Sequence, residues 1–313
     1  VGTQAPILPA TAAPARPEAR ELAPILPATT TPVRPEAREL TLASGAKMPL
    51  IGLGTWEADP GVVGSAVQAS LDAGCRHLDC AAAYRNEHEV GEALAASGVP
   101  RKEIFITSKL WNDRRRPADV EAALDKTLSR LGTDYLDLCL IHWPVVWAKD
   151  SVMKPDAQAS LRETWQTLEK LVDAGKIKHI GVSNYNEAEV KELLSYARIR
   201  PAVNQIELHP WTQKPALVSY LREHGILPIA YSSLAPLSTW RVDLGKDGRS
   251  AELMAESKSE DSVFRKLAKK LGVTEAQVLL RWGVQSGYPI LPRSTNRDRV
   301  RQNIDVFSFS IPE

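Results

Sequence analysis

The chain has 313 residues, and its 39 lysines and arginines against 38 aspartates and glutamates leave a formal net charge of +1. This balance argues against binding of nucleic acid through excess positive charge, and no apolar run approaches the ~20 residues of a membrane helix. The length suits one large barrel or two modest domains.

Many of the prolines lie in the first 40 residues, where an 18-residue segment is repeated. Residues 5–22 (APILPATAAPARPEAREL) and 23–40 (APILPATTTPVRPEAREL) differ at only three of 18 positions. Proline at this density disfavours helices and strands, and two copies are too few to stack into a solenoid. We expect residues 1–38 to form a mostly disordered, flexible tail. A targeting peptide is the alternative, but such peptides contain few acids, whereas this segment has four arginines and four glutamates.

From residue 39 onward, short strand-like runs alternate with helical stretches. Residues 39–49 predict a small hairpin that turns at Ser44–Gly45. Eight strand candidates follow in chain order: 50–56, 76–81, 104–111, 135–143, 176–184, 202–209, 227–234 and 288–294.

Several stretches between these strands have helical periodicity. Four of them end on glycine, which is a typical C-terminal stop: 60–74, 116–132, 160–175 and 214–225. A further helix in 273–282 would begin after Thr274, with Gln277 as its capping-box partner.

Eight alternating units over about 250 residues match a (β/α)8 TIM barrel, so we predict one α/β barrel domain over residues 39–313. A doubly wound sheet is the competing fold. It usually places G-x-G-x-x-G after its first strand, whereas this chain has GLGTWEADPG there.

Cysteine spacing gives a limited prediction about location. Cys75, Cys80 and Cys139 have no C-x-x-C spacing and lie in or beside apolar runs. We interpret them as reduced thiols of the core, which indicates a reducing compartment such as the cytoplasm. No metal site is predicted.

Candidate chemistry lies at the carboxyl ends of the predicted strands, where barrels of this kind carry their active sites. Four ionisable groups come from strands two to four and from just beyond them: Asp79, Tyr84, Lys109 and His142. Each alone has a structural interpretation, because Asp79 suits a helix cap, Lys109 a strand end, His142 a barrel interior and Tyr84 a rim.

Together the four groups suit proton transfer to a carbonyl oxygen. A tyrosine hydroxyl has a pKa near ~10 and is a poor donor at neutral pH unless an ammonium beside it lowers that pKa. A carboxylate paired with the ammonium keeps it charged, and a neutral imidazole can hold the substrate carbonyl by a hydrogen bond.

Motifs at these strand ends resemble those of the aldo-keto reductase superfamily, in its aldehyde reductase and aldose reductase-like form. The matching segments are GLGTW (52–56), LDxAxxYxNE (78–87), ITSKLW (106–111), LIHWP (140–144), GVSN (181–184), VNQIELHP (203–210) and PRS…R…QN (292–303). The resemblance covers about residues 40–311, with the motifs in the same order. It implies that Tyr84 is the general acid/base and Lys109 its pKa-lowering partner, that Asp79 pairs with the lysine, and that His142 orients the carbonyl.

The same resemblance implies NADPH/NADP⁺ as the cofactor. Tyr231 would stack on the nicotinamide, while Arg293 and Arg299 would hold the 2′-phosphate. The implied cofactor-binding set is Thr55, Ser183, Asn184, Gln205, Tyr231, Ser232, Leu234, Arg293, Ser294, Asn296, Arg299, Gln302 and Asn303.

Residues 291–303 (LPRSTNRDRVRQN) support this prediction from their chemistry. They contain four arginines and one aspartate, and arginine supplies forked donors that suit a phosphate. A solvated helix face is the alternative, and it suits Arg297 or Arg301. No acid stands where a ribose 2′-hydroxyl would need one, which favours NADP over NAD. The degree of preference stays open, since the family often has Lys at position 293 and Glu at 302. The run Arg114–Arg116 is predicted to be a polar loop.

The eight tryptophans are unevenly distributed along the predicted barrel. Only Trp165 and Trp282 fall in predicted helices, and the other six follow strands or lie in loops at the same end, including Trp147 and Trp211. An aromatic-lined substrate pocket is therefore predicted, suited to aromatic or medium-sized apolar aldehydes. Its expected lining is Trp56, Trp111, Trp143 and Trp240.

We therefore expect an NADP-dependent enzyme that reduces aldehydes, with ketones left open, and that binds a small carbonyl substrate but no nucleic acid or membrane. Members of the superfamily are commonly monomers, so we expect a monomer. They usually continue past the equivalent of 308–313 into a helix and a pocket-closing loop, which we expect to be missing here, with substrate selectivity affected most. The alternatives are a non-catalytic NADPH-binding regulatory or structural relative, and a reductase of sugars or sugar phosphates.

Overall fold

The computed structural model describes residues 38–56, 58, 61–151, 153–238, 255–256 and 259–312. The predicted tail, apart from Arg38, and the pocket candidate Trp240 lie outside these residues. The disorder of the tail and its boundary with the barrel therefore stay predictions.

A hairpin precedes the barrel, as predicted. Strands β1 (Glu39–Thr41) and β2 (Lys47–Pro49) pair antiparallel, and Gly45 in the turn between them has φ +86°, which glycine adopts at little cost. Met48 is fully buried in one cluster with Phe105 and Val203, the first residues of two barrel strands. The hairpin therefore covers the amino-terminal end of the barrel and leaves the opposite end for the site.

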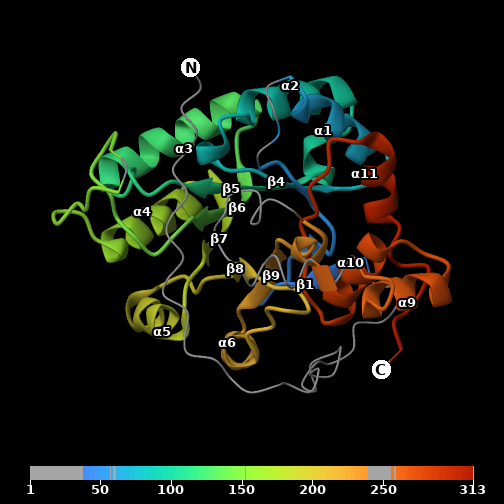
Figure 1. Ribbon diagram of the computed structural model, residues 1–313. Helices are drawn as coiled ribbons and strands as arrows, with labels where there is room; N and C mark the ends of the chain where they lie inside the picture. Colours follow the sequence, from blue (N-terminus) through green and yellow to red (C-terminus); the bar gives the residue numbers. More distant parts are fainter. Residues whose placement is uncertain are drawn as a thin grey trace.

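Seven parallel strands pair in chain order and curl into the barrel wall (Figure 1). They are β3 (Leu53–Gly54), β4 (His77–Asp79), β5 (Phe105–Leu110), β6 (Leu136–Ile141), β7 (Ile177–Ser183), β8 (Val203–Glu207) and β9 (Leu227–Tyr231). All six residues of β5 and all six of β6 are buried, as expected for strands covered on both faces.

The predicted eighth strand closes the barrel but is reduced to a bridge. Ile290 makes parallel bridges to Ile51 on one side and to Ala230 on the other. Pro289 and Pro292 flank it, and proline has no N–H to donate to a ladder, so pairing stops after one residue. The carbonyl oxygens of both prolines still accept hydrogen bonds, from the N–H groups of Ala230 and Gly54 at 2.8 and 3.0 Å. The predicted (β/α)8 barrel is confirmed.

Helices surround the curled sheet (Figure 1). They are α1 (Val63–Asp72), α2 (Glu87–Ser97), α3 (Pro117–Leu131), α4 (Leu161–Asp173), α5 (Glu187–Tyr196), α6 (Pro215–Glu223), α9 (Val263–Leu271), α10 (Glu275–Gln285) and α11 (Arg297–Ile304). Short 3₁₀ turns are η1 (Ala82–Tyr84), η2 (Arg101–Glu103) and η3 (Ala235–Leu237). None of the described helices is long and apolar enough to cross a membrane.

Local signals in the sequence explain several helix ends. The Thr274 hydroxyl accepts a hydrogen bond from the N–H of Gln277, whose side chain accepts one from the N–H of Thr274, which is the predicted capping box. Helix α3 begins on Pro117 and ends before Gly132, whose φ of +63° is the left-handed geometry of a helix stop.

Candidate active site

The carboxyl ends of three neighbouring strands bring the four predicted catalytic residues together. Asp79 is the last residue of β4, Lys109 lies near the end of β5, and His142 directly follows β6. Tyr84 ends η1, the turn after β4. The parallel register sets Gly54 beside Asp79 and Lys109 beside Leu140, so these side chains emerge at one end of the barrel.

The ammonium of Lys109 is the centre of this group. Lys109 is 2% exposed, and its Nζ donates to Asp79 Oδ2 at 2.5 Å, to the carbonyl of Cys80 at 2.9 Å and to Tyr84 Oη at 3.2 Å. Asp79 Oδ1 accepts a further hydrogen bond from Gln205 Nε2 at 2.8 Å. All three donor positions of the ammonium are used, so the lysine is held in one orientation against the phenol.

Burial and neighbouring charges have opposite effects on the pKa values of Lys109 and Tyr84. Burial would lower the pKa of Lys109, but the Asp79 carboxylate and Tyr84 outweigh burial and raise that pKa, so the lysine is a cation. Burial raises the pKa of Tyr84, and Lys109 lowers it by a smaller amount, so the net direction is upward. The expected pKa-lowering effect of Lys109 is present, but burial outweighs it, and the phenol is protonated at neutral pH.

His142 faces the phenol across a short gap. Its ring centroid lies 5.8 Å from that of Tyr84 and 4.9 Å from that of Trp111, both edge to face. Burial, together with the positive charges of Lys109 and Arg115, places the pKa of His142 well below its ordinary value. The imidazole is therefore neutral and can donate a hydrogen bond without carrying charge.

Residues at the ends of β7, β8 and β9 form a connected polar group. Asn184 Nδ2 donates to the His142 carbonyl at 3.1 Å, and Asn184 Oδ1 accepts from Tyr231 Oη at 2.7 Å. Ser183 Oγ donates to the carbonyl of Gln205 at 2.8 Å. Asn184 has φ +64° and Ser232 has φ +54°, conformations that carry strain in residues other than glycine and that concentrate at functional sites.

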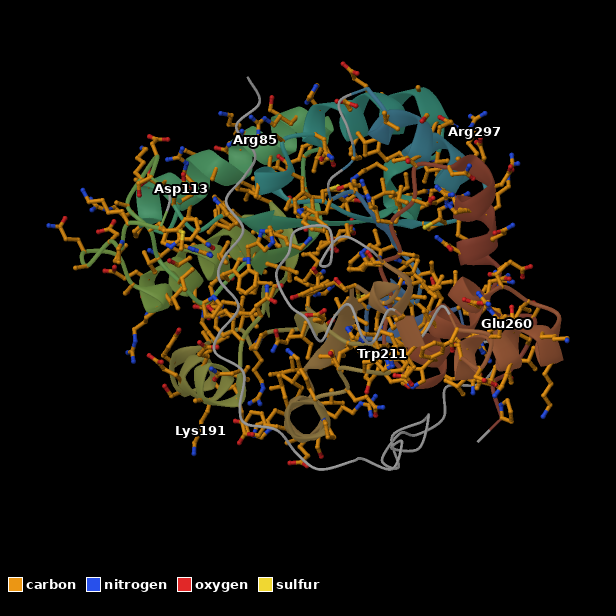
Figure 2. All side chains as sticks on the ribbon, viewed as in Figure 1. Arg85, Asp113, Lys191, Trp211, Glu260 and Arg297 are labelled. Atoms are coloured by element: carbon orange, nitrogen blue, oxygen red, sulfur yellow. The ribbon has the colours of Figure 1, made fainter. Side chains whose placement is uncertain are left out.

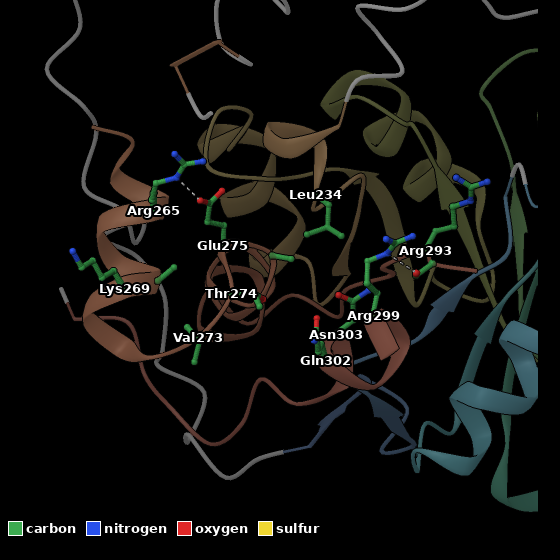
Figure 3. Close-up of a pocket in the computed structure, with 13 residues that line it drawn as sticks. Leu234, Arg265, Lys269, Val273, Thr274, Glu275, Arg293, Arg299, Gln302 and Asn303 are labelled. Carbon is green, nitrogen blue, oxygen red and sulfur yellow. Dashed lines mark hydrogen bonds and ion pairs between the residues drawn. The ribbon is translucent and has the colours of Figure 1, made fainter. Parts of the chain in front are cut away.

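An open cavity of about 550 Å³ lies between α9, α10, α11 and the segment that follows β9 (Figure 3). Six of the predicted cofactor residues line it: Leu234, Arg293, Ser294, Arg299, Gln302 and Asn303. Arg299 Nε donates to Ser294 Oγ at 3.4 Å, so an arginine and a hydroxyl lie side by side. This wall has the forked donors and hydroxyl that bind phosphate.

The opposite wall of the cavity was not predicted. It includes Arg265 and Lys269 of α9 and Glu275 of α10, and Arg265 Nε pairs with Glu275 Oε1 at 2.9 Å (Figure 3). These residues lie 18 or more positions before Arg293 in the chain. The basic composition of residues 265–270 (RKLAKK) indicates a charged surface, but it does not indicate that this surface lines the cavity.

Other assigned residues have local partners. Asn296 is the N-cap of α11 and accepts from the N–H groups of Asp298 and Arg299. Thr55 Oγ1 donates to the Asp79 carbonyl at 3.0 Å. Arg297 and Arg301 are exposed on α11, as expected for a solvated face, and Figure 2 shows Arg297 at the outer surface.

Tryptophans of the loops divide into two groups. Trp111 meets both His142 and the buried Trp147, the latter at 5.6 Å between ring centroids. Trp56 is 39% exposed, and Trp143 is half-buried beside His142 in the chain. Trp211 instead packs against Phe264 of α9. Trp147, which was not in the predicted pocket lining, therefore joins the aromatic wall beside His142.

The run Arg114–Arg116 lies in the loop between β5 and α3, as predicted, but the burial of its middle residue was not predicted. Arg114 and Arg116 pair with Asp150 and Asp156. Arg115 between them is only 1% exposed. Three arginines in a row give no alternation from which to predict that the middle one is buried.

Two residues of the 78–87 motif, Asn86 and Glu87, have buried contacts that the sequence analysis did not predict. Glu87 is fully buried and accepts a hydrogen bond from Ser108 Oγ at 2.7 Å, and burial raises its pKa. Asn86 Nδ2 donates to the Thr55 carbonyl at 2.8 Å. These contacts fasten the segment after Tyr84 to β3 and β5.

The three cysteines are buried and form no disulfide, which agrees with their interpretation as core thiols. Within the described part of the chain, no cluster of three or more histidine, cysteine or acidic side chains could hold a metal ion.

The fold and the site thus define a barrel protein with a buried Asp–Lys–Tyr group at the carboxyl ends of its strands and a cavity lined by arginines. A model of the Aldo/keto reductase family matches residues 50–313, and the chain belongs to this family. Similar curated proteins include aldo-keto reductase family 1 member A1 of Xenopus tropicalis, 42% identical over 87% of this chain and 85% of the relative. An aldo/keto reductase of Synechocystis is 45% identical over 87% of this chain and 84% of its own length.

Solved structures agree with the family. An aldo-keto reductase of Bombyx mori, determined in complex with NADP, superposes with a TM-score of 0.79 at 35% identity, covering 88% of this chain and 89% of that one. Aldo-keto reductases use NADP(H) and act in the oxidation and reduction of carbonyl compounds.

Proposed function

We propose that this protein catalyses the NADPH-dependent reduction of aldehydes to alcohols, with Tyr84 as the proton donor. The observation that carries the proposal is the buried chain of contacts from Gln205 through Asp79 and Lys109 to Tyr84, with a neutral His142 opposite. Each of these groups has one chemical part in the reaction.

NADPH, when bound, supplies a hydride to the carbonyl carbon. Tyr84 Oη donates its proton to the carbonyl oxygen as negative charge develops there. Lys109, held at 3.2 Å from Tyr84 Oη, stabilises the phenolate that remains. Asp79 keeps Lys109 charged and in place, and neutral His142 donates a hydrogen bond to the same carbonyl oxygen.

The cofactor cavity supports NADP(H) over NAD(H). Arg293 and Arg299 suit the extra phosphate of NADP, with Ser294 Oγ beside them, and Leu234 offers an apolar contact. We propose that Ser183, Asn184 and Gln205 hold the carboxamide and that Tyr231 stacks on the nicotinamide. The Bombyx mori relative, whose structure contains NADP, supports this proposal.

We propose aromatic and medium-sized apolar aldehydes as the substrate class. The rings of Trp111 and Trp147 form an apolar wall directly beside His142, the group that orients the carbonyl. A sugar would present several hydroxyl groups to these rings and lose hydrogen bonds to water without replacing them.

Mixing the protein with NADPH and matched aromatic, aliphatic and sugar aldehydes, and following the loss of NADPH absorbance, tests the proposal. We expect turnover that is fastest with the aromatic aldehydes. Quenching of tryptophan fluorescence by NADPH without consumption of any aldehyde would instead favour the non-catalytic relative. Preference for sugars would overturn the substrate class, and equal rates with NADH would overturn the cofactor preference.

A further inference from the structure

Arg115 is a buried arginine that has no part in the proposed reaction. It lies in the loop between β5 and α3, is 1% exposed, and is among the largest fully buried side chains of the described residues. No carboxylate of a described residue forms an ion pair with it, and burial lowers its pKa to about 10. A buried guanidinium of this kind is costly to fold, since Nε and Nη1 also have no hydrogen-bond partner among the described residues.

The contacts that Arg115 does make join two loops of the candidate site. Its Nη2 donates to the carbonyl of Trp143 and to Asn112 Oδ1, both at 3.0 Å. The Asn112 carbonyl in turn accepts from the N–H of Trp147 at 2.8 Å. The loop after β5 is therefore tied twice to the segment 143–147 that follows His142.

A third contact fastens the arginine itself. The carbonyl of Arg115 accepts a hydrogen bond from Thr164 Oγ1 of α4 at 2.7 Å. Asn184 Nδ2 holds the same strand end from its other side, through the His142 carbonyl. The backbone of residues 142–143 thus lies between a donor from Asn184 and a donor from Arg115.

We propose that Arg115 is a positioning residue that holds His142 and the wall of Trp111 and Trp147 in the geometry that receives the substrate carbonyl. The inference rests on the proposed function, because it holds that the hydrogen bonds of Arg115 to Asn112 and to the Trp143 carbonyl serve the binding of a substrate carbonyl. The guanidinium acts through the Trp143 carbonyl and through Asn112, and it touches neither cofactor nor substrate.

The position of Arg115 has an electrostatic consequence for His142. The charged or titratable groups around the imidazole are Tyr84 from η1, Lys109 from β5 and Arg115 from the loop, with Asp79 paired to the lysine. Both cations lower the pKa of His142. Loss of the Arg115 charge therefore raises that pKa and lets His142 take up a proton at a higher pH.

Three substitutions separate the hydrogen bonds of the Arg115 guanidinium from its charge. Arg115→Met removes both, and we expect the aldehyde KM to rise and kcat/KM to fall at least tenfold while the Kd for NADPH stays within twofold of wild type. Asn112→Asp keeps an oxygen to accept from Arg115 but sets an anion beside it. We expect this variant to raise the pKa of His142. Arg115→Lys keeps the charge but not the forked donors of the guanidinium, so it should raise the aldehyde KM and leave the His142 titration unchanged.

NMR titration of the imidazole C–H signals, with the His142 signal assigned by its loss in His142→Gln, follows the pKa without any need for turnover. Arg116→Met is the matched control, since it removes a neighbouring arginine that is exposed and paired with Asp156. The inference is wrong if Arg115→Met keeps the wild-type aldehyde KM and His142 titration, or changes them no more than Arg116→Met does. If Arg115→Met does not fold, a wild-type aldehyde KM in Arg115→Lys overturns the inference in its place. Absence of wild-type turnover with every aldehyde would sink the proposed function instead, and the titration would still test the electrostatic effect of Arg115.

Discussion

Replacing Asp79 by asparagine tests how the buried ion pair supports both the fold and the proposed chemistry. Asp79 Oδ2 accepts from Lys109 at 2.5 Å, and both side chains are almost completely buried. The substitution keeps the size of the side chain but leaves the lysine without its counter-ion. Removing one partner of a buried pair destabilises a protein by about 3–5 kcal/mol. With a urea m-value of roughly 3 kcal/mol/M for a chain of this size, the unfolding midpoint should fall by about 1–2 M.

The same substitution changes the pH dependence of turnover in a known direction. Burial lowers the pKa of Lys109, and the Asp79 carboxylate is the largest influence that raises it. In Asp79→Asn the pKa of the lysine therefore falls, and the ammonium beside Tyr84 is lost at a lower pH than in wild type. We expect the alkaline decline of kcat/KM for aldehyde reduction to begin at a correspondingly lower pH.

Urea unfolding followed by circular dichroism and a pH series of kcat/KM are the two assays. Asp137→Asn is the matched control, because Asp137 is also buried and pairs with Arg101 and Lys178, but lies near the start of β6 at the other end of the barrel. It should lower stability without moving the pH profile. A wild-type urea midpoint and a wild-type pH profile in Asp79→Asn would refute the reasoning.

Three further predictions concern the cofactor cavity, a buried histidine and the packing of the barrel. Arg299→Met should weaken NADPH binding by roughly 10- to 100-fold in a fluorescence titration, because a charged hydrogen bond contributes about 1.5–3 kcal/mol. The affinity of Arg299→Met for NADH should change little, and so should the affinity of the control Arg301→Met for NADPH. Burial lowers the pKa of His77 to about 4, so the unfolded chain binds a proton more tightly and stability is lost as the pH falls from about 6.5 towards 4. This loss reaches about 2 kcal/mol at pH 5, and it should be absent from urea titrations of His77→Gln. A Cβ at Gly181 would lie 2.8 Å from Val203 Cγ2, so Gly181→Ala should lower the unfolding free energy by about 1–3 kcal/mol, and an unchanged melting temperature would contradict that packing.

Features that depend on a few neighbouring residues were predictable from the sequence. The capping box of Thr274 and Gln277 and the helix between Pro117 and Gly132 rest on contacts within a few positions of the chain. The alternation of strands and helices likewise indicated the barrel. Because parallel strands end at one side of a barrel, that prediction also indicated that Asp79 and Lys109 would meet.

Features that depend on packing between distant segments were not predictable in the same way. Arg115 is buried because two loops and α4 close around it, and nothing in the run Arg114–Arg116 marks the middle residue. The net pKa of Tyr84 depends on how deeply the ring is buried, and burial outweighs the adjacent lysine. The cavity wall formed by Arg265 and Glu275 required the placement of α9 against α10.

Turnover and cofactor binding in Tyr84→Phe test the central claim most directly. The substitution removes only the hydroxyl that lies 3.2 Å from Lys109 Nζ, so the cavity that would hold NADPH is unchanged. We predict that reduction of a reactive aromatic aldehyde is abolished while quenching of tryptophan fluorescence by NADPH gives a nearly wild-type Kd. Aldehyde reduction at a rate near that of wild type would contradict the assignment of Tyr84 as the proton donor.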